Sequence, residues 1–360
     1  MKNHVIISFF IPHLGCNSQC VFCNQKTITG YRAGPDPRTV GRVIADRLRS
    51  LPPGAECEVA FYGGSFTALP WSRQQLYLEA VQPFINRGEI KSIRVSTRPD
   101  AIDGPGLDGL MAYGVRTVEL GVQSLDGEVL KASGRNYDAS LVENASLLIK
   151  EKGLSLGHQL MIGLPASNLA KELETAERVI RIGPDMVRIY PTLVLKGTPL
   201  AELYREGRYQ PLSLKEAVDT ALLLLTQFEK AGIKVIRMGL QPTPELEKSG
   251  ELLAGPYHPG FGELVQAELF KWQAIHLIER FREREVTNRL KIYVDQRDLS
   301  KMIGHNRCNI HSLKARFHLE KLEVIGTKGT EKDWVGVGLW HREAPQMVLS
   351  RQSFLGPDND

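Results

Sequence analysis

The chain has 360 residues, of which 42% are hydrophobic and 24% are charged, and it contains 33 glycines. This composition is typical of a globular protein of about two domains, and it excludes a collagen-like or an intrinsically disordered chain. The formal net charge of +4 is too small to indicate nucleic-acid binding by itself. No segment approaches the roughly 20 consecutive apolar residues of a membrane span, so we expect no membrane partner.

Five cysteines are an odd number, and three of them, Cys16, Cys20 and Cys23, lie close together. This pattern favours a metal site over a disulfide framework and predicts a cytoplasmic protein. The apolar N-terminal run that leads into Cys16 could also be a lipoprotein signal. Because Pro12 and His13 interrupt that run, we interpret it as a β-strand.

Short β-rich runs alternate with helical stretches up to about residue 240, as expected for βα units around a parallel sheet. Seven such runs are predicted, at residues 5–11, 58–62, 92–96, 117–122, 155–162, 186–193 and 234–237. The amphipathic helix predicted at 213–231 exemplifies the intervening segments. Turn and polar residues follow most of the strands, so we predict an α/β fold: a partial parallel (β/α)6 TIM-like barrel over residues 1–240, with its functional groups at one mouth.

The composition changes beyond residue 240. Residues 241–285 begin with a stretch rich in Pro and Gly, which we interpret as a lid or linker, and continue into a helix at 263–284. Residues 286–345 form a small predicted α+β module. Its expected elements are a strand at 290–294, a helix at 299–303, a tight loop at 304–307, a helix at 310–317, and strands at 321–325 and 334–340. Residues 346–360 are expected to be a tail with a frayed end.

The strongest functional signal is the pattern Cys16-x3-Cys20-x2-Cys23, which directly follows the first predicted strand. It places three thiols on one short loop at the mouth of the predicted barrel. Cysteine thiolates hold iron–sulfur clusters, and three such ligands leave one iron open to bind a substrate or cofactor. The alternative is a structural zinc ion, with His13 as the fourth ligand.

This cysteine spacing, with Phe22 just before the third cysteine, resembles that of the radical S-adenosylmethionine (SAM) superfamily. The resemblance implies a 4Fe-4S cluster on the three cysteines, with SAM bound to its open iron. It also implies reductive cleavage of SAM to methionine and a 5′-deoxyadenosyl radical, which abstracts a hydrogen atom. An electron donor such as flavodoxin or ferredoxin would then be a partner.

Further motifs extend the resemblance. Gly63, Gly64 and Ser65 look like the glycine pair whose backbone binds the SAM amino group, a role that suits residues without a Cβ. The segments around Ser96 and Glu119 are similar to the radical domain of the Elongator catalytic subunit. The resemblance implies cofactor contacts for Phe22 and all of these residues.

Resemblance to the oxygen-independent coproporphyrinogen oxidase implies that Gln123 and Arg135 also contact SAM. The sequence departs from that enzyme at Gln159, where the enzyme has an aspartate. The alternative for Glu119 is a structural acid paired with Arg94 or Arg116.

The Elongator subunit joins its radical domain to an acetyltransferase domain. Only about 120 residues follow the predicted barrel here, and they contain no recognisable acetyl-CoA loop, so we expect no acetyl-CoA partner. RNA, either tRNA or rRNA, remains the expected substrate. The other hypotheses are radical chemistry on a small molecule or a protein, and a non-catalytic zinc protein that binds RNA.

The C-terminal module bears on the choice between these hypotheses. Its order of strand, helix, Gly304-x-x-Arg307, helix and strand resembles the KH domain, whose GxxG loop clamps a nucleic-acid backbone. Residues 271–328 contain 13 Lys and Arg against 7 Asp and Glu, which indicates phosphate binding unless this is merely a solvated helical face. The predicted RNA contacts are Lys301, Gly304, His305, Asn306, Arg307 and Lys314.

Overall fold

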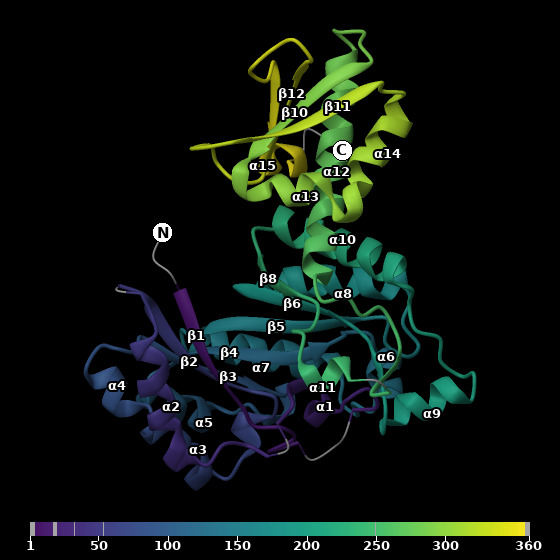
Figure 1. Ribbon diagram of the computed structural model, residues 1–360. Coiled ribbons are helices and arrows are strands. Elements are labelled where there is room, and N and C mark those ends of the chain that lie inside the picture. Colours follow the sequence, from purple (N-terminus) through teal and green to yellow (C-terminus); the bar gives the residue numbers. More distant parts are fainter. Residues whose placement is uncertain (1–3, 17–19, 32, 53, 249, 357–360) are drawn as a thin grey trace. The chain divides into compact units, whose positions relative to one another are not determined.

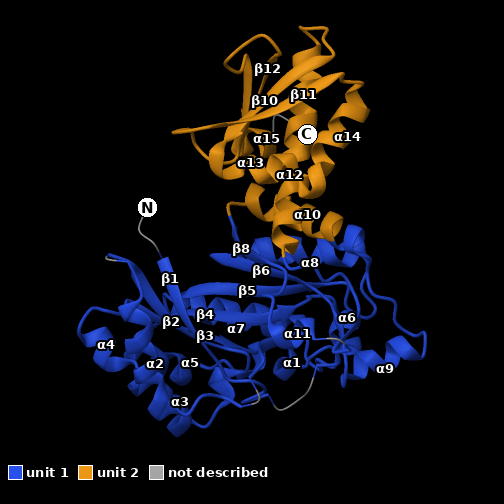
Figure 2. Ribbon diagram, viewed as in Figure 1, with its two compact units in different colours: residues 1–217, 233–259 blue, residues 218–232, 260–360 orange. Residues whose placement is uncertain are grey.

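The computed structural model describes residues 4–16, 20–31, 33–52, 54–248 and 250–356. These residues divide into a first unit, Met1–Ala217 with Ile233–Pro259, and a second unit, Val218–Gly232 with Gly260–Asp360 (Figure 2). The helix predicted at 213–231 is present as α10 (Leu214–Lys230). Its residues from 218 onward belong to the second unit.

A parallel sheet forms the centre of the first unit (Figure 1). Within the described residues it has seven strands, in the order in which they occur along the chain. They are β1 (His4–Phe10), β2 (Glu56–Tyr62), β3 (Ser92–Thr97), β4 (Val115–Gln123), β5 (Ser155–Ile162), β6 (Met186–Pro191) and β8 (Lys234–Met238). All neighbouring strands pair in parallel, and β1 and β8 form the two edges of the curled half-barrel. The predicted partial barrel is confirmed.

Hydrophobic strands with helices between them explain this architecture. In β2, for example, Val59, Ala60 and Phe61 are successive residues and all are fully buried, so both faces of the strand are covered. The α-helices of the unit are α1 (Gln25–Thr29), α2 (Pro37–Arg49), α3 (Trp71–Glu79), α4 (Gln82–Asn86), α5 (Gly104–Ala112), α6 (Gly127–Ala132), α7 (Ala139–Glu151), α8 (Leu169–Ile182), α9 (Pro199–Arg205) and α11 (Pro244–Glu247). Two 3-10 helices, Phe66–Ala68 and Pro99–Ala101, follow β2 and β3. Each therefore lies where its strand ends.

The segment interpreted as a lid contains more structure than its sequence indicated. Strand β9 (Leu252–Ala254) pairs antiparallel with the short strand β7 (Val194–Leu195). The segment also contacts α1, because the Thr243 hydroxyl donates a hydrogen bond to the Ile28 carbonyl oxygen at 3.1 Å. The absence of a strand period was misleading here because strands of two or three residues are too short to display one.

The second unit contains a four-stranded sheet in the order β11-β10-β12-β13. Its strands are β10 (Arg289–Asp295), β11 (Lys321–Thr327), β12 (Trp334–Leu339) and β13 (Met347–Ser350), and β10 and β11 pair in parallel. Its other elements are α12 (Phe261–Arg282), α13 (Leu299–Ile303), α14 (Cys308–Phe317), α15 (Arg351–Leu355) and the 3-10 helices Gln296–Asp298 and His305–Arg307. Side chains of α12, α13 and α14 share an apolar core with the sheet.

Two expectations for the C-terminal region differ from the structure. Most of the expected tail at 346–360 is ordered, because β13 pairs with β12 and α15 follows it directly. Residues 357–360 lie outside the described residues. The helix predicted at 263–284 is α12, which is not part of a linker but supplies Phe270, Leu277 and Phe281 to the core of the second unit.

Candidate functional site

The cysteine loop begins where β1 ends. The Cys16 amide donates to the His13 carbonyl oxygen at 3.2 Å, and the Cys23 amide donates to the Cys20 carbonyl oxygen at 3.0 Å. Residues 17–19 of the loop lie outside the described residues. Burial, together with the neighbouring Cys20 and Cys16, raises the pKa of the Cys23 thiol to about 12. The structure therefore brings the three predicted ligands together, and their charges would repel one another unless a bound cation compensated them.

The donor set consists of three thiols on one loop, which is the ligand chemistry of an iron–sulfur cluster. In the described part of the chain, no three His, Cys, Asp or Glu side chains are placed to hold one metal ion. His13, the fourth ligand of the zinc alternative, accepts a hydrogen bond at Nε2 from the Gln25 amide at 3.1 Å. One zinc ion needs all its ligands around a single centre, whereas the cysteines of a cluster bind different iron atoms and stand further apart.

The loop that contains Gly63, Gly64 and Ser65 packs directly against the cysteine loop. The Ser65 amide donates to the Leu14 carbonyl oxygen at 2.8 Å. A Cβ on Gly64 would lie 2.6 Å from the Ile11 carbonyl oxygen, and a Cβ on Gly15, where φ is +75°, would overlap the Ser65 carbonyl oxygen. Backbone meets backbone at both positions, so glycine is required there.

A small hydroxyl network extends from Ser65, which is fully buried. Its Oγ lies 2.9 Å from Thr97 Oγ1 and accepts a hydrogen bond from the Arg98 amide at 3.1 Å. Thr67 Oγ1 lies 2.5 Å from Thr97 Oγ1. Ser65, Thr67 and Arg98 line a cavity of about 430 Å³ that also contacts Gly15. In the segment around Ser96, the sequence analysis selected Ser96 itself as a cofactor contact and missed Thr97. Ser96 is half-buried, whereas Thr97 is buried.

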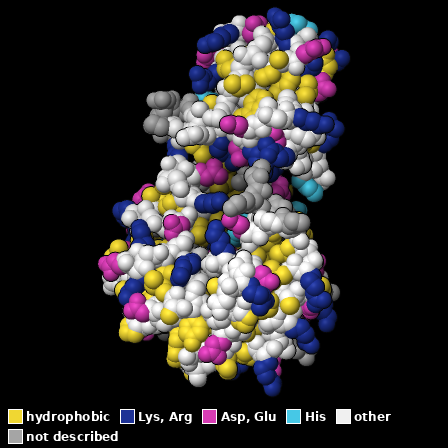
Figure 3. All heavy atoms as spheres, turned by 90° about the vertical axis from the view of Figure 1, so that its left-hand side faces the viewer, with side chains coloured by type: hydrophobic (Ala, Val, Ile, Leu, Met, Phe, Trp, Pro, Cys, Tyr) yellow, Lys and Arg dark blue, Asp and Glu magenta, His cyan; other side chains and the backbone are white. Residues whose placement is uncertain are grey.

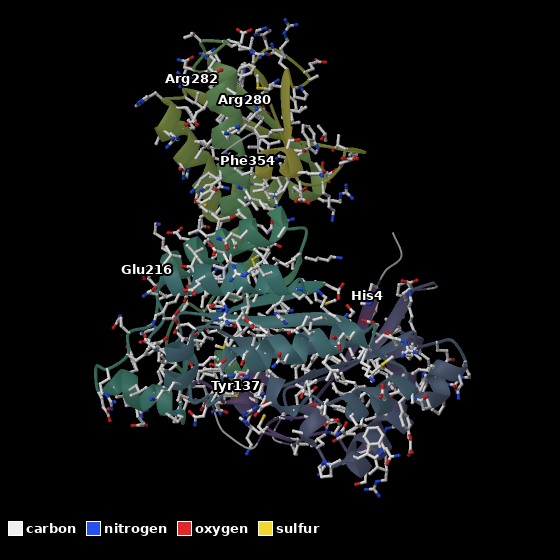
Figure 4. All side chains as sticks on the ribbon, turned by 180° about the vertical axis from the view of Figure 1, so that it is seen from behind. His4, Tyr137, Glu216, Arg280, Arg282 and Phe354 are labelled. Atoms are coloured by element: carbon white, nitrogen blue, oxygen red, sulfur yellow. The ribbon has the colours of Figure 1, made fainter. Side chains whose placement is uncertain are left out.

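Arg135 connects the cysteine loop with the carboxyl end of β4. Its guanidinium donates to Cys20 Sγ at 3.4 Å, to the Gly121 carbonyl oxygen at 2.5 Å and to the Tyr137 hydroxyl at 2.6 Å. Arg135 is only 3% exposed, so it is not a solvated side chain at the end of a helix. Figure 4 labels Tyr137 among the side chains of the first unit.

Gln123 ends β4 in an unusual conformation. Its φ of 68° is left-handed, and the pairing of β4 with β5 shifts register between Gly121 and Gln123. Its Oε1 accepts a hydrogen bond from the Gln159 amide at 3.3 Å, so the residue that departs from the related oxidase is its direct partner. Non-glycine residues with such a backbone cluster at functional sites, because the surrounding structure must offset the strain.

Glu119 lies inside the half-barrel and is 4% exposed. Its Oε1 is 2.8 Å from Arg94 Nη1, and its Oε2 is 2.6 Å from Arg188 Nε. Burial alone would raise the pKa of this carboxyl, but Arg188 and Arg94 outweigh burial and hold it below the usual value. Arg94 is one of the two structural partners considered for Glu119, whereas Arg116 instead donates to backbone carbonyl oxygens.

Two further side chains, Tyr62 and Glu58, belong to the buried polar group around Glu119, and the sequence analysis missed both of them. The Tyr62 hydroxyl donates to Glu119 Oε1 at 3.3 Å and accepts from Arg188 Nη2 at 3.1 Å. Arg94 also pairs with Glu58 at 2.9 Å. These residues come from β2, β3, β4 and β6, and only the curl of the sheet brings them together.

Phe22 has an apolar environment. It packs beside Val194, Leu200, Ala201 and Tyr209, in a cluster that also includes residues of β9. The aromatic side chain next to the third cysteine therefore anchors the cysteine loop to the rest of the unit.

The predicted RNA contacts lie in the second unit, around the loop between α13 and α14. Gly304, Asn306 and Arg307 all have positive φ, and Arg307 is exposed. Lys301 is already engaged, because its Nζ lies 2.9 Å from Asp298 Oδ1. His305 and Asn306 are exposed, whereas Lys314 is half-buried on α14.

Comparison with known families agrees with this site. The family described as the Radical SAM superfamily matches residues 10–179, and the Radical_SAM C-terminal domain matches residues 184–271. The chain belongs to the radical SAM superfamily. This membership confirms the expectation of an enzyme. A 4Fe-4S cluster and SAM are the cofactors that the family implies, and the thiol arrangement described above fits them.

Characterised relatives share part of the chain. A tRNA uridine(34) acetyltransferase of Methanocaldococcus infernus is 28% identical over 214 residues, which is 54% of this chain and 40% of that protein. The human Elongator complex protein 3 is 27% identical over 255 residues, 59% of this chain and 46% of that protein. The chain therefore spans less than half the length of these two relatives.

Among solved structures, an archaeal Elp3 from Methanocaldococcus infernus superposes with a TM-score of 0.61 at 23% identity. The superposition covers 76% of this chain and 64% of the archaeal one, and it supports the fold. None of the helices in the described ranges combines the length and the hydropathy that a bilayer span requires.

Proposed function

We propose that this chain holds a 4Fe-4S cluster through Cys16, Cys20 and Cys23 and uses SAM to modify RNA. The observation that carries the proposal is the meeting of three thiols on one loop, with the buried Arg135 at 3.4 Å from Cys20 Sγ. Bound there, the cluster supplies the electron that cleaves SAM to methionine and a 5′-deoxyadenosyl radical, which takes a hydrogen atom from the substrate.

The protein contributes binding and orientation. In this proposal the backbone of Gly63, Gly64 and Ser65, which packs against the cysteine loop, binds the SAM amino group. Gln123 and Arg135 lie at the end of β4, where they would hold the rest of SAM. We assign Glu119 a positioning role, because both of its oxygens are used by arginines. Ser96 and Phe22 stay predicted contacts.

An RNA substrate, tRNA or rRNA, is supported by two observations. The relatives that match a little over half of the chain include tRNA uridine(34) acetyltransferases. Residues 271–328 also carry a net charge of +6, as expected of a phosphate-binding surface. In this proposal the KH-like loop from Gly304 to Arg307 contacts the RNA backbone, together with Lys314.

The cluster assignment is tested on anaerobically purified protein. We expect about four iron atoms with sulfide per chain, a brown chromophore and formation of 5′-deoxyadenosine with a reductant. The variant C16A/C20A/C23A should lose all three properties, while C308A, at an exposed cysteine of the second unit, should keep them. One zinc per chain, or a triple variant that still holds four iron atoms, would contradict the proposal.

The substrate is tested separately. Nucleoside mass spectrometry of RNA from a deletion strain should reveal one modified nucleoside missing, and complementation should restore it. A variant without the cysteines should fail to restore it, because the reaction requires the radical. An unchanged nucleoside profile would favour a small molecule or a protein as the substrate instead.

The electron donor is part of the same proposal. A one-electron protein donor such as flavodoxin or ferredoxin should replace a chemical reductant in the 5′-deoxyadenosine assay. No product with either donor, in the presence of a reduced and intact cluster, would exclude both of them.

A further inference from the structure

The sheet of the second unit has one face covered by helices and one face turned away from them. Leu290, Ile292 and Val294 of β10 belong to the apolar core that the sheet shares with α12, α13 and α14. Because side chains alternate along a strand, Lys291 and Tyr293 lie on the opposite face, called here the outer face. The parallel register places Lys321 of β11 beside Arg289 on this same face.

A tryptophan flanked by cations occupies one end of the outer face. Lys291 Nζ lies 5.8 Å from the centroid of the Trp340 ring, and Lys321 Nζ lies 5.6 Å from it. Trp340 is half-buried, so part of its ring stays accessible. A cation above an aromatic face is attracted to the ring, which keeps both ammonium groups near the accessible ring surface.

The chain around Trp340 makes this arrangement rigid. The Tyr293 hydroxyl donates to the Arg342 carbonyl oxygen at 2.9 Å, and Lys291 Nζ donates to the same oxygen at 3.2 Å. A Cβ on Gly336 would lie 2.7 Å from the Pro345 ring, so this glycine allows the segment after Trp340 to fold back over the sheet. Lys291 and the segment after Trp340 are therefore held together before any ligand binds.

This surface carries both cations and carboxylates. Arg289 is paired with Glu320 at 2.6 Å, whereas Lys291 and Lys321 are in no ion pair among the described residues. Glu323 is in register with Lys291, and burial, followed by Glu323 and Glu343, raises the pKa of the Tyr293 hydroxyl. Figure 3 shows hydrophobic side chains gathered on one side of the C-terminal module, with side chains of both charges around them. An aromatic ring with two lysines beside it suits a ligand with flat bases and a negative backbone.

We propose that the outer face binds single-stranded RNA, with a base stacked on Trp340 and the neighbouring phosphates bound by Lys291 and Lys321. Aromatic side chains in a basic groove are the usual means of holding single strands, since every base has a π-face. This surface is separate from the Gly304–Arg307 loop, which joins the helices on the other face of the sheet. The inference rests on the proposed function, in which RNA is the substrate. It adds that the protein recognises an unpaired segment of that RNA.

The test is fluorescence anisotropy of the full-length chain with a labelled decauridine at low salt. This assay requires neither cluster nor SAM, so its failure is distinct from a failure of the radical chemistry. We expect W340A, and separately K291E/K321E, to weaken binding by about tenfold or more. A duplex RNA of equal length should bind more weakly than the single strand, because its bases are already stacked and paired.

Matched controls separate stacking from a general effect. W272A removes another exposed tryptophan of the same unit, on α12, and K328E/K332E makes the same charge change at exposed lysines between β11 and β12. Both should bind within about twofold of the wild type. Decauridine should quench tryptophan fluorescence in the W272F variant but not in W340F, a readout that a merely structural role of Trp340 would not produce.

Two outcomes would overturn the inference. One is the absence of decauridine binding by the wild-type chain at low salt, which would favour a protein ligand for this face. The other is wild-type affinity in W340A and K291E/K321E combined with lost affinity in R307E/K314E, which would assign RNA binding to the α13–α14 loop.

Discussion

The two units differ in how deeply their ion pairs are buried. In the radical SAM unit, Glu58, Arg94 and Glu119 are all less than 10% exposed, so both partners of each pair lie inside the half-barrel. In the second unit the buried Asp295 and Asp298 pair with partly exposed cations, and ion pairs such as Arg289–Glu320 and Arg316–Glu279 are about half-exposed. Buried ion pairs cost desolvation, so they persist where they hold a geometry, whereas surface cations act on a ligand through long-range attraction.

The difference indicates how each unit contributes. The interior charges of the first unit are fully committed to one another, which leaves the loops at the strand ends to bind cofactors. The surface charges of the second unit are only partly committed, since Arg307 and Lys314 are exposed or half-buried and belong to no ion pair among the described residues, although Lys314 helps to lower the pKa of Glu320. The first unit is therefore organised for chemistry at a fixed point, and the second for contact with an extended anion.

Removing Glu119 should have the largest effect on stability. E119A leaves Arg94 with only Glu58 and leaves Arg188 without its carboxylate partner. An uncompensated buried charge costs about 3–5 kcal/mol, so urea unfolding followed by circular dichroism should reveal a loss of this size. A loss below about 1 kcal/mol would contradict the view that the interior charges hold the half-barrel together.

Gly64→Ala should have a smaller effect that is centred on the cysteine loop. The added Cβ would meet the backbone oxygens of Ile11 and Leu14, which cannot move without shifting the loop. We expect a loss of about 1–3 kcal/mol and a reduced iron content after reconstitution. Gly41→Ala is the control, because the new Cβ on α2 would make ordinary contacts at 3.6 Å. It should leave the iron content unchanged and, as an alanine inside a helix, raise stability by up to about 1 kcal/mol.

His158 should make the first unit sensitive to acid. Burial, with a contribution from Lys150, lowers the pKa of this histidine from 6.5 to about 3. Because the folded pKa is the lower one, its contribution to stability is present above pH 6.5 and is lost as the pH falls. The loss should be about 1.4 kcal/mol per pH unit below 6.5.

The H158L variant tests this assignment by unfolding experiments between pH 7 and pH 4.5. It should lose less stability over this range than the wild type, by the slope of about one proton. H341A, at an exposed histidine of the second unit, is the control and should follow the wild type. Parallel curves for H158L and the wild type would show that His158 is not the responsible group.

Removing Glu279 should have the smallest effect. E279A makes the same change, glutamate to alanine, as E119A. In this ion pair, however, Arg316 is 54% exposed and Glu279 is 50% exposed. Exposed ion pairs contribute about 0.2–1 kcal/mol and are weakened by salt. E279A should therefore lose less than about 1 kcal/mol in the urea experiment, and the loss should shrink further at high salt. A loss comparable to that of E119A would remove the distinction between the two units.

Much of the fold could be predicted because it depends on patterns between neighbours along the chain. The run at 155–162 is β5 with the same bounds, and the helix at 299–303 is α13 with the same bounds. Strands β7, β9 and β13 were not predicted. They have two to four residues each and are defined by their partners in the sheet rather than by a period of their own.

The candidate site was predicted only where a motif is continuous in the sequence. The three cysteines, the Gly63–Ser65 turn and Arg135 lie together as expected. Thr97 as the hydroxyl partner of Ser65 and Arg188 as the partner of Glu119 were missed, because these pairs are separated by 32 and 69 residues. No spacing rule connects residues on strands that meet only after the sheet has curled.

The sequence by itself determined the alternation of strands and helices, the loop with three thiols and the positive charge of the C-terminal module. These features follow from local periodicity and composition, which do not depend on distant contacts. Only the tertiary structure decided that Glu119 is held by two arginines, that Arg135 contacts Cys20 and that Trp340 stands between two lysines. Each of these depends on which strands lie side by side, and strand pairing is settled by packing over the whole unit.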